Sequence, residues 1–147
     1  MSAETRVPRG LAVATLALAA LLASSGRAAE ESSAGSAAVL SLMQRDLAGV
    51  SGKEVLVLTV EYGPGESSQP HRHDSNVFVY VLQGSVRMQV QGQKPVTLTA
   101  GQTFYEGPGD VHLVSANASA TQPAKFLVFM VKSKGAPVTL PAAGAKP

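Results

Sequence analysis

The 147-residue chain has room for one domain of ordinary size. Its formal charge of +2 comes from Arg6, Arg9 and Arg27 against Glu4, because the rest of the chain carries nine basic and nine acidic residues. Such a balanced domain has no basic patch for nucleic acid or for an anionic membrane, so we expect neither partner. The absence of cysteine excludes disulfides, thiolate metal sites and cysteine nucleophiles, which leaves histidine and carboxylate side chains as metal ligands.

The first 28 residues have the parts of a secretory signal peptide. Arg6 and Arg9 give a positive start, the uncharged run Leu11–Ala23 follows, and small residues lead to a cleavage point. The run has 13 residues, fewer than the roughly 18 to 20 that span a bilayer, although an uncleaved anchor stays an alternative. We therefore predict a signal helix in residues 1–28 and a bacterial protein that is exported to the periplasm or secreted, with no membrane contact after cleavage.

The rest of the chain divides into a linker, one domain and a tail. Residues 29–38 are small and polar and predict a flexible linker, residues 39–134 form the domain, and residues 135–147 predict a flexible C-terminal tail. Within the domain, Ser41–Leu47 could form a short helix. Short β-rich runs between Gly, Pro and Asn signals predict strands at Glu54–Tyr62, Val77–Gln83, Ser85–Gln91, Val96–Thr99, Thr103–Glu106, His112–Ala116 and Lys125–Lys132.

Many short strands at regular spacing favour a β-sandwich or barrel. Two of the predicted strands, around Leu56–Val60 and Val77–Leu82, are apolar on both faces. One face would line the barrel and the other would meet a partner sheet. We therefore expect a homodimer that forms through such a face.

Three histidines are the most informative residues of the chain. His71 and His73 are two residues apart, so in an extended segment their side chains leave the same face. His112 follows a Gly-Pro-Gly-Asp turn that would begin another strand. An isolated His-x-His pair is more often without a role, but three imidazoles from neighbouring strands can converge on one divalent ion and leave positions open for water or substrate. The ion would be Fe, Mn, Zn, Ni or Cu.

Two segments resemble the motifs of the cupin superfamily. From Gly65 to Gly84 the chain reads GESSQPHRHDSNVFVYVLQG, and from Gly101 to Asn117 it reads GQTFYEGPGDVHLVSAN. The resemblance implies an all-β, single-domain cupin-type β-barrel, which is a double-sheet jelly roll. It also implies that the metal ligands are His71, His73 and His112.

The glycine and proline residues of the two motifs have backbone preferences that suit the turns expected at their positions. Gly84 and Gly101 can take the positive φ that tight turns between strands require. Pro108-Gly109 forms a turn that directs His112 toward the barrel interior.

The chain departs from the cupin pattern at one ligand. Cupins often place a Glu between the His-x-His pair and the closing Gly, where this chain has Val77. Three outcomes follow: a three-His site as in cupins that resemble thiol or diketone-cleaving dioxygenases, a substitute carboxylate, or a weak or absent metal. The nearest carboxylates in sequence are Asp74, Glu66 and Glu106. Gln69 is two residues before His71, so in an extended strand its side chain would leave the same face as the histidine pair.

The cupin fold carries many activities, so function rests on the site. The first hypothesis is a metal-dependent oxidoreductase of dioxygenase type acting on a small molecule, with a Zn or Ni lyase or isomerase close behind. The alternative is a non-catalytic module that binds or senses a small molecule, or a barrel with an incidental site. Met88, Phe104, Tyr80 and Tyr105 could line the pocket, although core packing is the simpler interpretation. A second titratable group near the ion would favour the enzyme.

Overall fold

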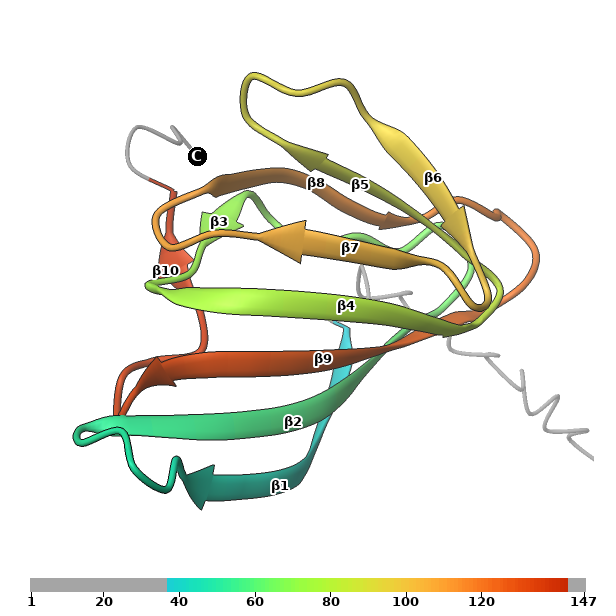
Figure 1. Ribbon diagram of the computed structural model, residues 1–147. Coiled ribbons are helices and arrows are strands. Elements are labelled where there is room, and N and C mark those ends of the chain that lie inside the picture. Colours follow the sequence, from blue (N-terminus) through green and yellow to red (C-terminus); the bar gives the residue numbers. More distant parts are fainter. Residues whose placement is uncertain (1–36, 143–147) are drawn as a thin grey trace, which may run out of the picture. The chain divides into compact units, whose positions relative to one another are not determined.

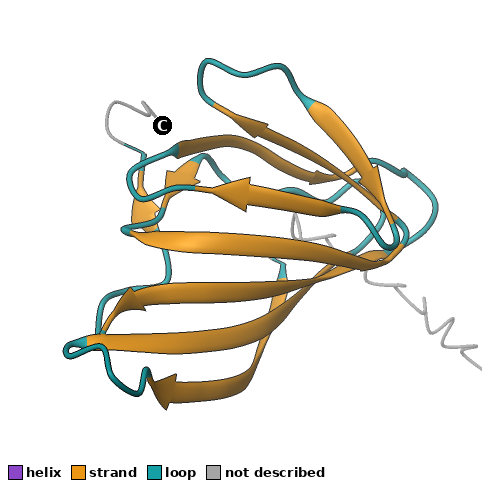
Figure 2. Ribbon diagram, in the orientation of Figure 1, coloured by secondary structure: helices purple, strands orange, loops and turns teal. Residues whose placement is uncertain are grey.

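A computed structural model describes residues 37–142. The predicted signal helix, most of the predicted linker and residues 143–147 lie outside the described residues. The described part consists of strands and loops without a helix (Figure 2). It therefore contains no helix that is long and apolar enough to cross a membrane. The strands are β1 (Ala38–Asp46), β2 (Lys53–Tyr62), β3 (His71–Arg72), β4 (Ser75–Gln83), β5 (Ser85–Val90), β6 (Val96–Thr99), β7 (Thr103–Glu106), β8 (Val111–Asn117), β9 (Ala124–Ser133) and β10 (Leu140–Pro141).

The strands form two five-stranded sheets that face each other (Figure 1). The first has the order β1-β2-β9-β4-β7 and the second β10-β3-β8-β5-β6, and every strand pair is antiparallel. This arrangement confirms the predicted all-β jelly roll. The seven predicted strands all occur, and their ends differ from the predicted ones by at most two residues.

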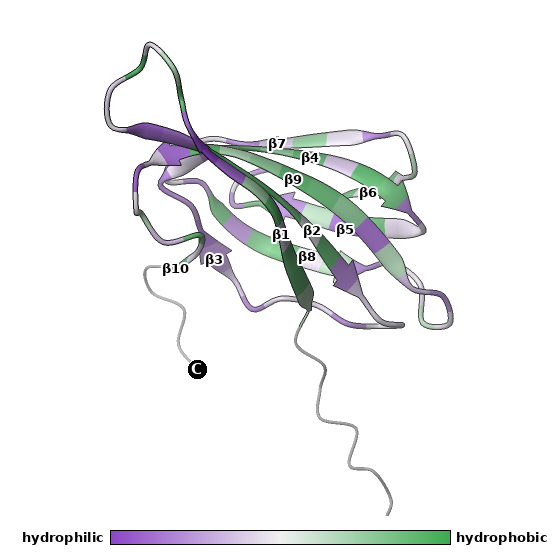
Figure 3. Cartoon of the chain, turned by 90° about the horizontal axis from the view of Figure 1, so that it is seen from below, coloured by the Kyte–Doolittle hydropathy of each residue, from purple (hydrophilic) through white to green (hydrophobic). Residues whose placement is uncertain are grey.

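Alternating burial shows which side of each strand faces the interior. In β9, and in β4 as far as Val81, every second residue is buried, as a strand with one face on a core requires. Figure 3 shows the apolar segments of the sheets. The core is aliphatic with few aromatic side chains and consists of Leu56, Leu58, Tyr62, Val77, Val79, Val81, Val86, Met88, Leu98, Ala124, Phe126, Val128 and Met130.

Strand β1 replaces the short helix that the sequence could have formed over Ser41–Leu47. Its residues pair with β2 from Ala38 opposite Glu61 to Asp46 opposite Glu54. The local residues are good helix formers, but the free edge of β2 offers a full ladder of hydrogen bonds, and this tertiary pairing prevails over local propensity. The helix prediction is therefore wrong.

The C-terminal strap, which we define as residues 135–142, was expected to be part of a flexible tail but belongs to the domain. The ammonium group of Lys132, which is buried, pairs with the carboxylate of Glu54 and donates a second hydrogen bond to the Ala136 carbonyl (2.7 Å). The Gly135 N–H donates to the same carboxylate (3.1 Å). Hydrogen bonds from Lys132, and then from Gln44, lower the pKa of Glu54 from 4.5 to about 2.

The far end of the strap extends a sheet. Strand β10 pairs with β3, with Leu140 opposite Arg72 and Pro141 opposite His71. The small and proline-containing sequence of this segment gave no strand signal, because two residues are too few for a pattern. The predicted start of the tail at residue 135 is therefore wrong for residues 135–142.

Candidate metal centre

Strands β3 and β8 bring the three histidines together. His71 lies directly opposite His112 in the antiparallel register, and His73 follows β3. The ring centroids are 4.9 Å apart for His71 and His73 and 5.1 Å for His71 and His112. One ring nitrogen from each residue can be chosen so that all three lie within 4.8 Å of one another. His73 and His112 are buried and His71 is half-buried.

Backbone carbonyls fix two of the imidazoles. The Nδ1 of His71 donates to the Gln69 carbonyl (2.7 Å), and the Nδ1 of His73 donates to the Val138 carbonyl in the strap (2.5 Å). A histidine whose Nδ1 carries the proton presents the lone pair of Nε2 to an ion, so these bonds orient both rings as ligands. Burial lowers the pKa of His71, which keeps that imidazole neutral near pH 7.

The third imidazole packs differently. The ring of His112 stacks on Phe104 at a centroid distance of 5.9 Å. Both of its nitrogens are buried and lack a hydrogen-bond partner. Buried polar atoms without partners are costly, and in a metal protein the missing partner is commonly the ion.

Glu106 is the one carboxylate of the three candidates that lies beside the histidines. Its Oε2 is 3.1 Å from His112 Nδ1 and 3.9 Å from His73 Nε2. Asp74 is exposed and pairs with Arg72 (2.6 Å), and Glu66 accepts a hydrogen bond from the Gly63 N–H (2.6 Å).

The histidines open into a cavity of about 1100 Å³ between the two sheets. Most of its wall is apolar, from β2, β4 and β9. One polar group on the wall is the Tyr62 hydroxyl, which contacts the hydroxyls of Ser68 and Ser115 (2.8 Å to the latter). Among the described residues, the lining includes the carboxylates of Glu66 and Glu106 but no lysine or arginine. The strap closes one side with residues 138–141.

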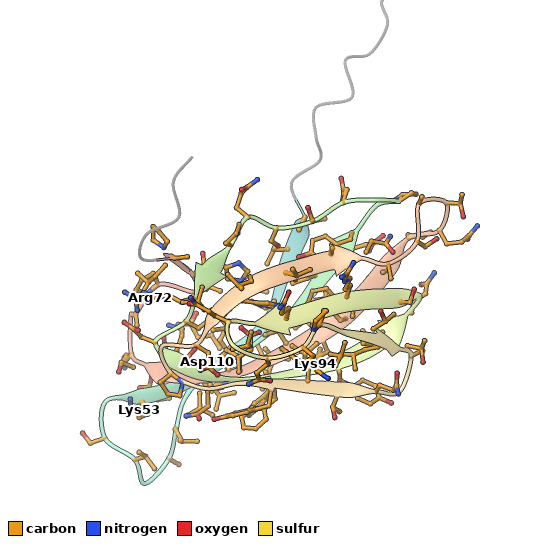
Figure 4. The ribbon with its side chains drawn as sticks, turned by 90° about the horizontal axis from the view of Figure 1, so that it is seen from above. Lys53, Arg72, Lys94 and Asp110 are labelled. Atoms are coloured by element: carbon orange, nitrogen blue, oxygen red, sulfur yellow. The ribbon has the colours of Figure 1, made fainter. Side chains whose placement is uncertain are left out.

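The other residues singled out from the sequence have mixed positions. Met88 is fully buried and lines the cavity, and Phe104 contacts His112. Tyr80 and Tyr105 are 44% and 51% exposed, which excludes both from the core. Arg72, which stands between His71 and His73 in the sequence, is half-buried and pairs with Asp74; Figure 4 labels it. Sequence reasoning missed Val138, because its contribution is a backbone oxygen that any residue type would offer.

The turn before His112 has the expected chemistry. The Asp110 N–H donates to the Gly107 carbonyl (3.2 Å), and Gly109 has φ of 83°. Proline followed by a glycine with positive φ is the pattern of a type II turn. The Gly109 N–H also donates to the His73 carbonyl (2.8 Å), so this turn ties the segment that carries His73 to the strand that carries His112.

Comparison with known proteins agrees with this architecture. The model of the family described as Cupin domain matches residues 58–130, which include all three histidines and both motifs. The chain belongs to the cupin superfamily. A search of curated proteins finds no match.

Solved cupin-like structures share the fold at low sequence identity. A protein with a double-stranded β-helix domain from Klebsiella pneumoniae is 17% identical over 69% of this chain and 82% of its own, with a TM-score of 0.57. A DMSP lyase from Ruegeria pomeroyi is 17% identical over 76% of this chain and 54% of its own, with a TM-score of 0.59. An oxalate oxidase solved with the substrate analogue glycolate is 23% identical over 71% of this chain and 54% of its own (TM-score 0.56). This chain therefore spans about half of each of the two enzymes, and the likeness shows the fold alone.

The residues of this cupin fit a divalent metal ion. Three imidazoles converge, two are held with Nε2 free, and the third has no partner within the described structure. Imidazole donors suit Zn, Cu, Fe and Ni, so the donor set is compatible with the ions expected from the sequence.

Proposed function

We propose that this cupin is an exported protein that binds one divalent metal ion through His71, His73 and His112 and acts as an oxidoreductase of dioxygenase type on a small molecule. The observation that carries the proposal is the convergence of three imidazoles, two of them oriented by backbone carbonyls, at the wall of a large cavity. When bound, the ion would polarise a substrate oxygen or activate O₂.

The cavity wall indicates the kind of substrate. Apolar side chains from both sheets line the cavity around the histidines. The Tyr62 hydroxyl, held by two serines, is a hydrogen-bonding group for a polar part of the substrate. Because no lysine or arginine belongs to the described lining, we infer an uncharged, mostly apolar substrate that binds the ion through oxygen.

The alternative function is a module that binds or senses a small molecule without turnover. A mostly apolar wall suits binding as well as catalysis. The buried carboxylate of Glu106 beside two of the histidines is a second titratable group at the site, and this observation favours the enzyme. Consumption of O₂ with phenols, diketones or thiols by the metal-loaded protein would separate the two functions.

Metal analysis tests the proposal directly. The full chain is expressed in a bacterium and the product is recovered from the periplasm, where the mass of the protein also reports whether residues 1–28 have been removed. We expect close to one metal ion per chain by mass spectrometry, and loss of the ion in His71→Ala. Arg72→Ala is the matched control, because Arg72 is the neighbour of His71 and its side chain pairs with Asp74 instead of joining the histidines. Wild-type protein without metal after loading with Fe²⁺, Mn²⁺, Zn²⁺, Ni²⁺ and Cu²⁺ in turn would contradict the proposal, and so would equal metal content in the His71 variant.

We also propose a homodimer. The outer face of β4, β7 and β9 carries a cluster of exposed aromatic side chains, in which Phe78 contacts Tyr105 and Phe129 at centroid distances of 5.2 and 6.1 Å. Apolar patches of this kind on a sheet commonly mark an interface.

A further inference from the structure

The side chain of Glu106 is buried where a lone carboxylate is unfavourable. The residue is 2% exposed, and its Oε2 has no hydrogen-bond partner. A buried carboxylate without a partner costs several kcal/mol, on the order of the stability of a small domain, so such groups are normally paired or bound to a metal. The position of Glu106 therefore calls for a positive partner.

The described structure contains no lysine or arginine that could be this partner. The groups within ion-pair distance of Glu106 are His73 Nε2 at 3.9 Å and His112 Nδ1 at 3.1 Å. The hydrogen bond to the Val138 carbonyl places the proton of the neutral ring on Nδ1, so His73 Nε2 has none to donate. The contact to His112 lacks the geometry of a hydrogen bond. Glu106 Oε2 and His73 Nε2 are then two acceptors that face each other, and they repel unless a cation lies between them.

Strand pairing explains how the carboxylate reaches this place. Glu106 on β7 lies directly opposite Val77 on β4 in the antiparallel register. Both residues are buried and both line the cavity. Paired residues on one face of neighbouring strands have Cβ atoms about 4.5–5.5 Å apart, so the two side chains point into the same part of the cavity.

We propose that Glu106 is a fourth protein ligand of the metal ion, supplied by β7 across the register from Val77. The inference rests on the proposed metal site and adds an oxygen donor to it. Three neutral imidazoles leave the full charge of +2 on the ion, and one carboxylate lowers the site charge to +1. A set of three nitrogens and one oxygen is harder than imidazoles alone, which favours Mn²⁺, Fe²⁺ or Zn²⁺ over Cu⁺.

Two matched neutralisations test whether the charge at Glu106 binds the ion. Glu106→Gln and Glu66→Gln each remove one carboxylate from the same cavity, but Glu66 bonds to the backbone of Gly63 instead of facing the imidazoles. Titration with Co²⁺ alone, followed by visible absorption and calorimetry, gives both the affinity and the ligand field. We expect Glu106→Gln to bind Co²⁺ about 10- to 100-fold more weakly with an altered spectrum, and Glu66→Gln to behave as wild type.

Moving the carboxylate from β7 to β4 distinguishes a metal ligand from a carboxylate that only supports the fold. Glu106→Val removes a buried charge without a partner, so the melting temperature of the metal-free protein should stay equal or rise while the affinity for Co²⁺ falls. The double variant Val77→Glu/Glu106→Val returns the carboxylate from the opposite register position and keeps the composition of the cavity. We expect it to regain most of the lost affinity.

The outcomes distinguish this inference from the proposed function. Wild-type protein that binds no Co²⁺ overturns the metal site as a whole. Stoichiometric binding by wild type together with equal affinity in Glu106→Val overturns the role of Glu106 alone. A fall in the melting temperature of metal-free Glu106→Val shows a structural role and also overturns it, as does a folded double variant that binds Co²⁺ no better than Glu106→Val.

Discussion

Gly84 lies at the turn between β4 and β5, where the backbone excludes any side chain. Its φ is 71°, and a Cβ built there would collide with the Pro123 carbonyl oxygen. Gly101 has a similar φ of 89° but open space around the same position. The two glycines, both expected from the sequence to take positive φ, therefore differ in one respect that can be measured.

We expect Gly84→Ala to cost more stability than Gly101→Ala. Gly101→Ala should lose about 1–2 kcal/mol, the cost of a left-handed backbone in a residue with Cβ. Gly84→Ala adds a collision with backbone atoms that cannot rotate away, and should lose about 1–3 kcal/mol more. Chemical denaturation of both variants measures the difference. Equal losses would mean that β5 moves away from Pro123 without cost.

At the same scale, sequence spacing found the histidines but could not select the carboxylate. The spacing of His71, His73 and His112 follows the motif, so these three residues could be named in advance. Glu106 was one of three carboxylates, because the pairing that brings β7 beside β4 joins segments about thirty residues apart and leaves no local pattern. The contribution of Val138 was invisible for the simpler reason that it comes from the main chain.

The C-terminal strap is the element that connects the buried Lys132–Glu54 pair to the candidate metal site. One end is held by hydrogen bonds at Gly135 and Ala136, and the other end pairs with β3. Between them the Val138 carbonyl orients His73. The strap therefore acts as a support of the site.

Truncation of the strap should weaken metal binding more than it weakens the fold. A chain that ends at Lys134 keeps all strands except β10 but loses the acceptor of His73, and we expect about 10- to 100-fold lower affinity for Zn²⁺ by competition with a chelator. A chain that ends at Ala142 is the control and should bind as wild type. Unchanged affinity in the shorter chain would show that His73 needs no support from the strap.

Sequence reasoning at the level of elements succeeded where a strand carries its own pattern. Strands β4 and β9 alternate buried and open positions over many residues and were predicted almost to their ends. Strand β1 is exposed along its whole length, so no alternation marks it, and its pairing with β2 decided its conformation. Strands β3 and β10 have two residues each and exist through their neighbours.

For the whole molecule, the proposed homodimer should depend on the aromatic face. Phe78 is 46% exposed at the centre of this face, and Phe78→Asp would place a charge there. We expect wild type to elute as a dimer in size-exclusion chromatography with light scattering, and Phe78→Asp to shift to a monomer at micromolar concentration. Leu113→Asp, on the opposite sheet at 37% exposure, is the control and should stay dimeric. A monomeric wild type would refute the proposal.

The hydrogen bond from His73 to the Val138 carbonyl has a consequence for how such proteins diverge. Every amino acid offers the same carbonyl oxygen, so the residue type at position 138 can change while the hydrogen bond to the imidazole is retained. An insertion or deletion between Lys132 and Leu140 would instead carry that oxygen away from the ring. Among homologues, the length of this segment should be preserved more strictly than its residues, and a functional constraint there would show in the gaps of an alignment and not in its columns.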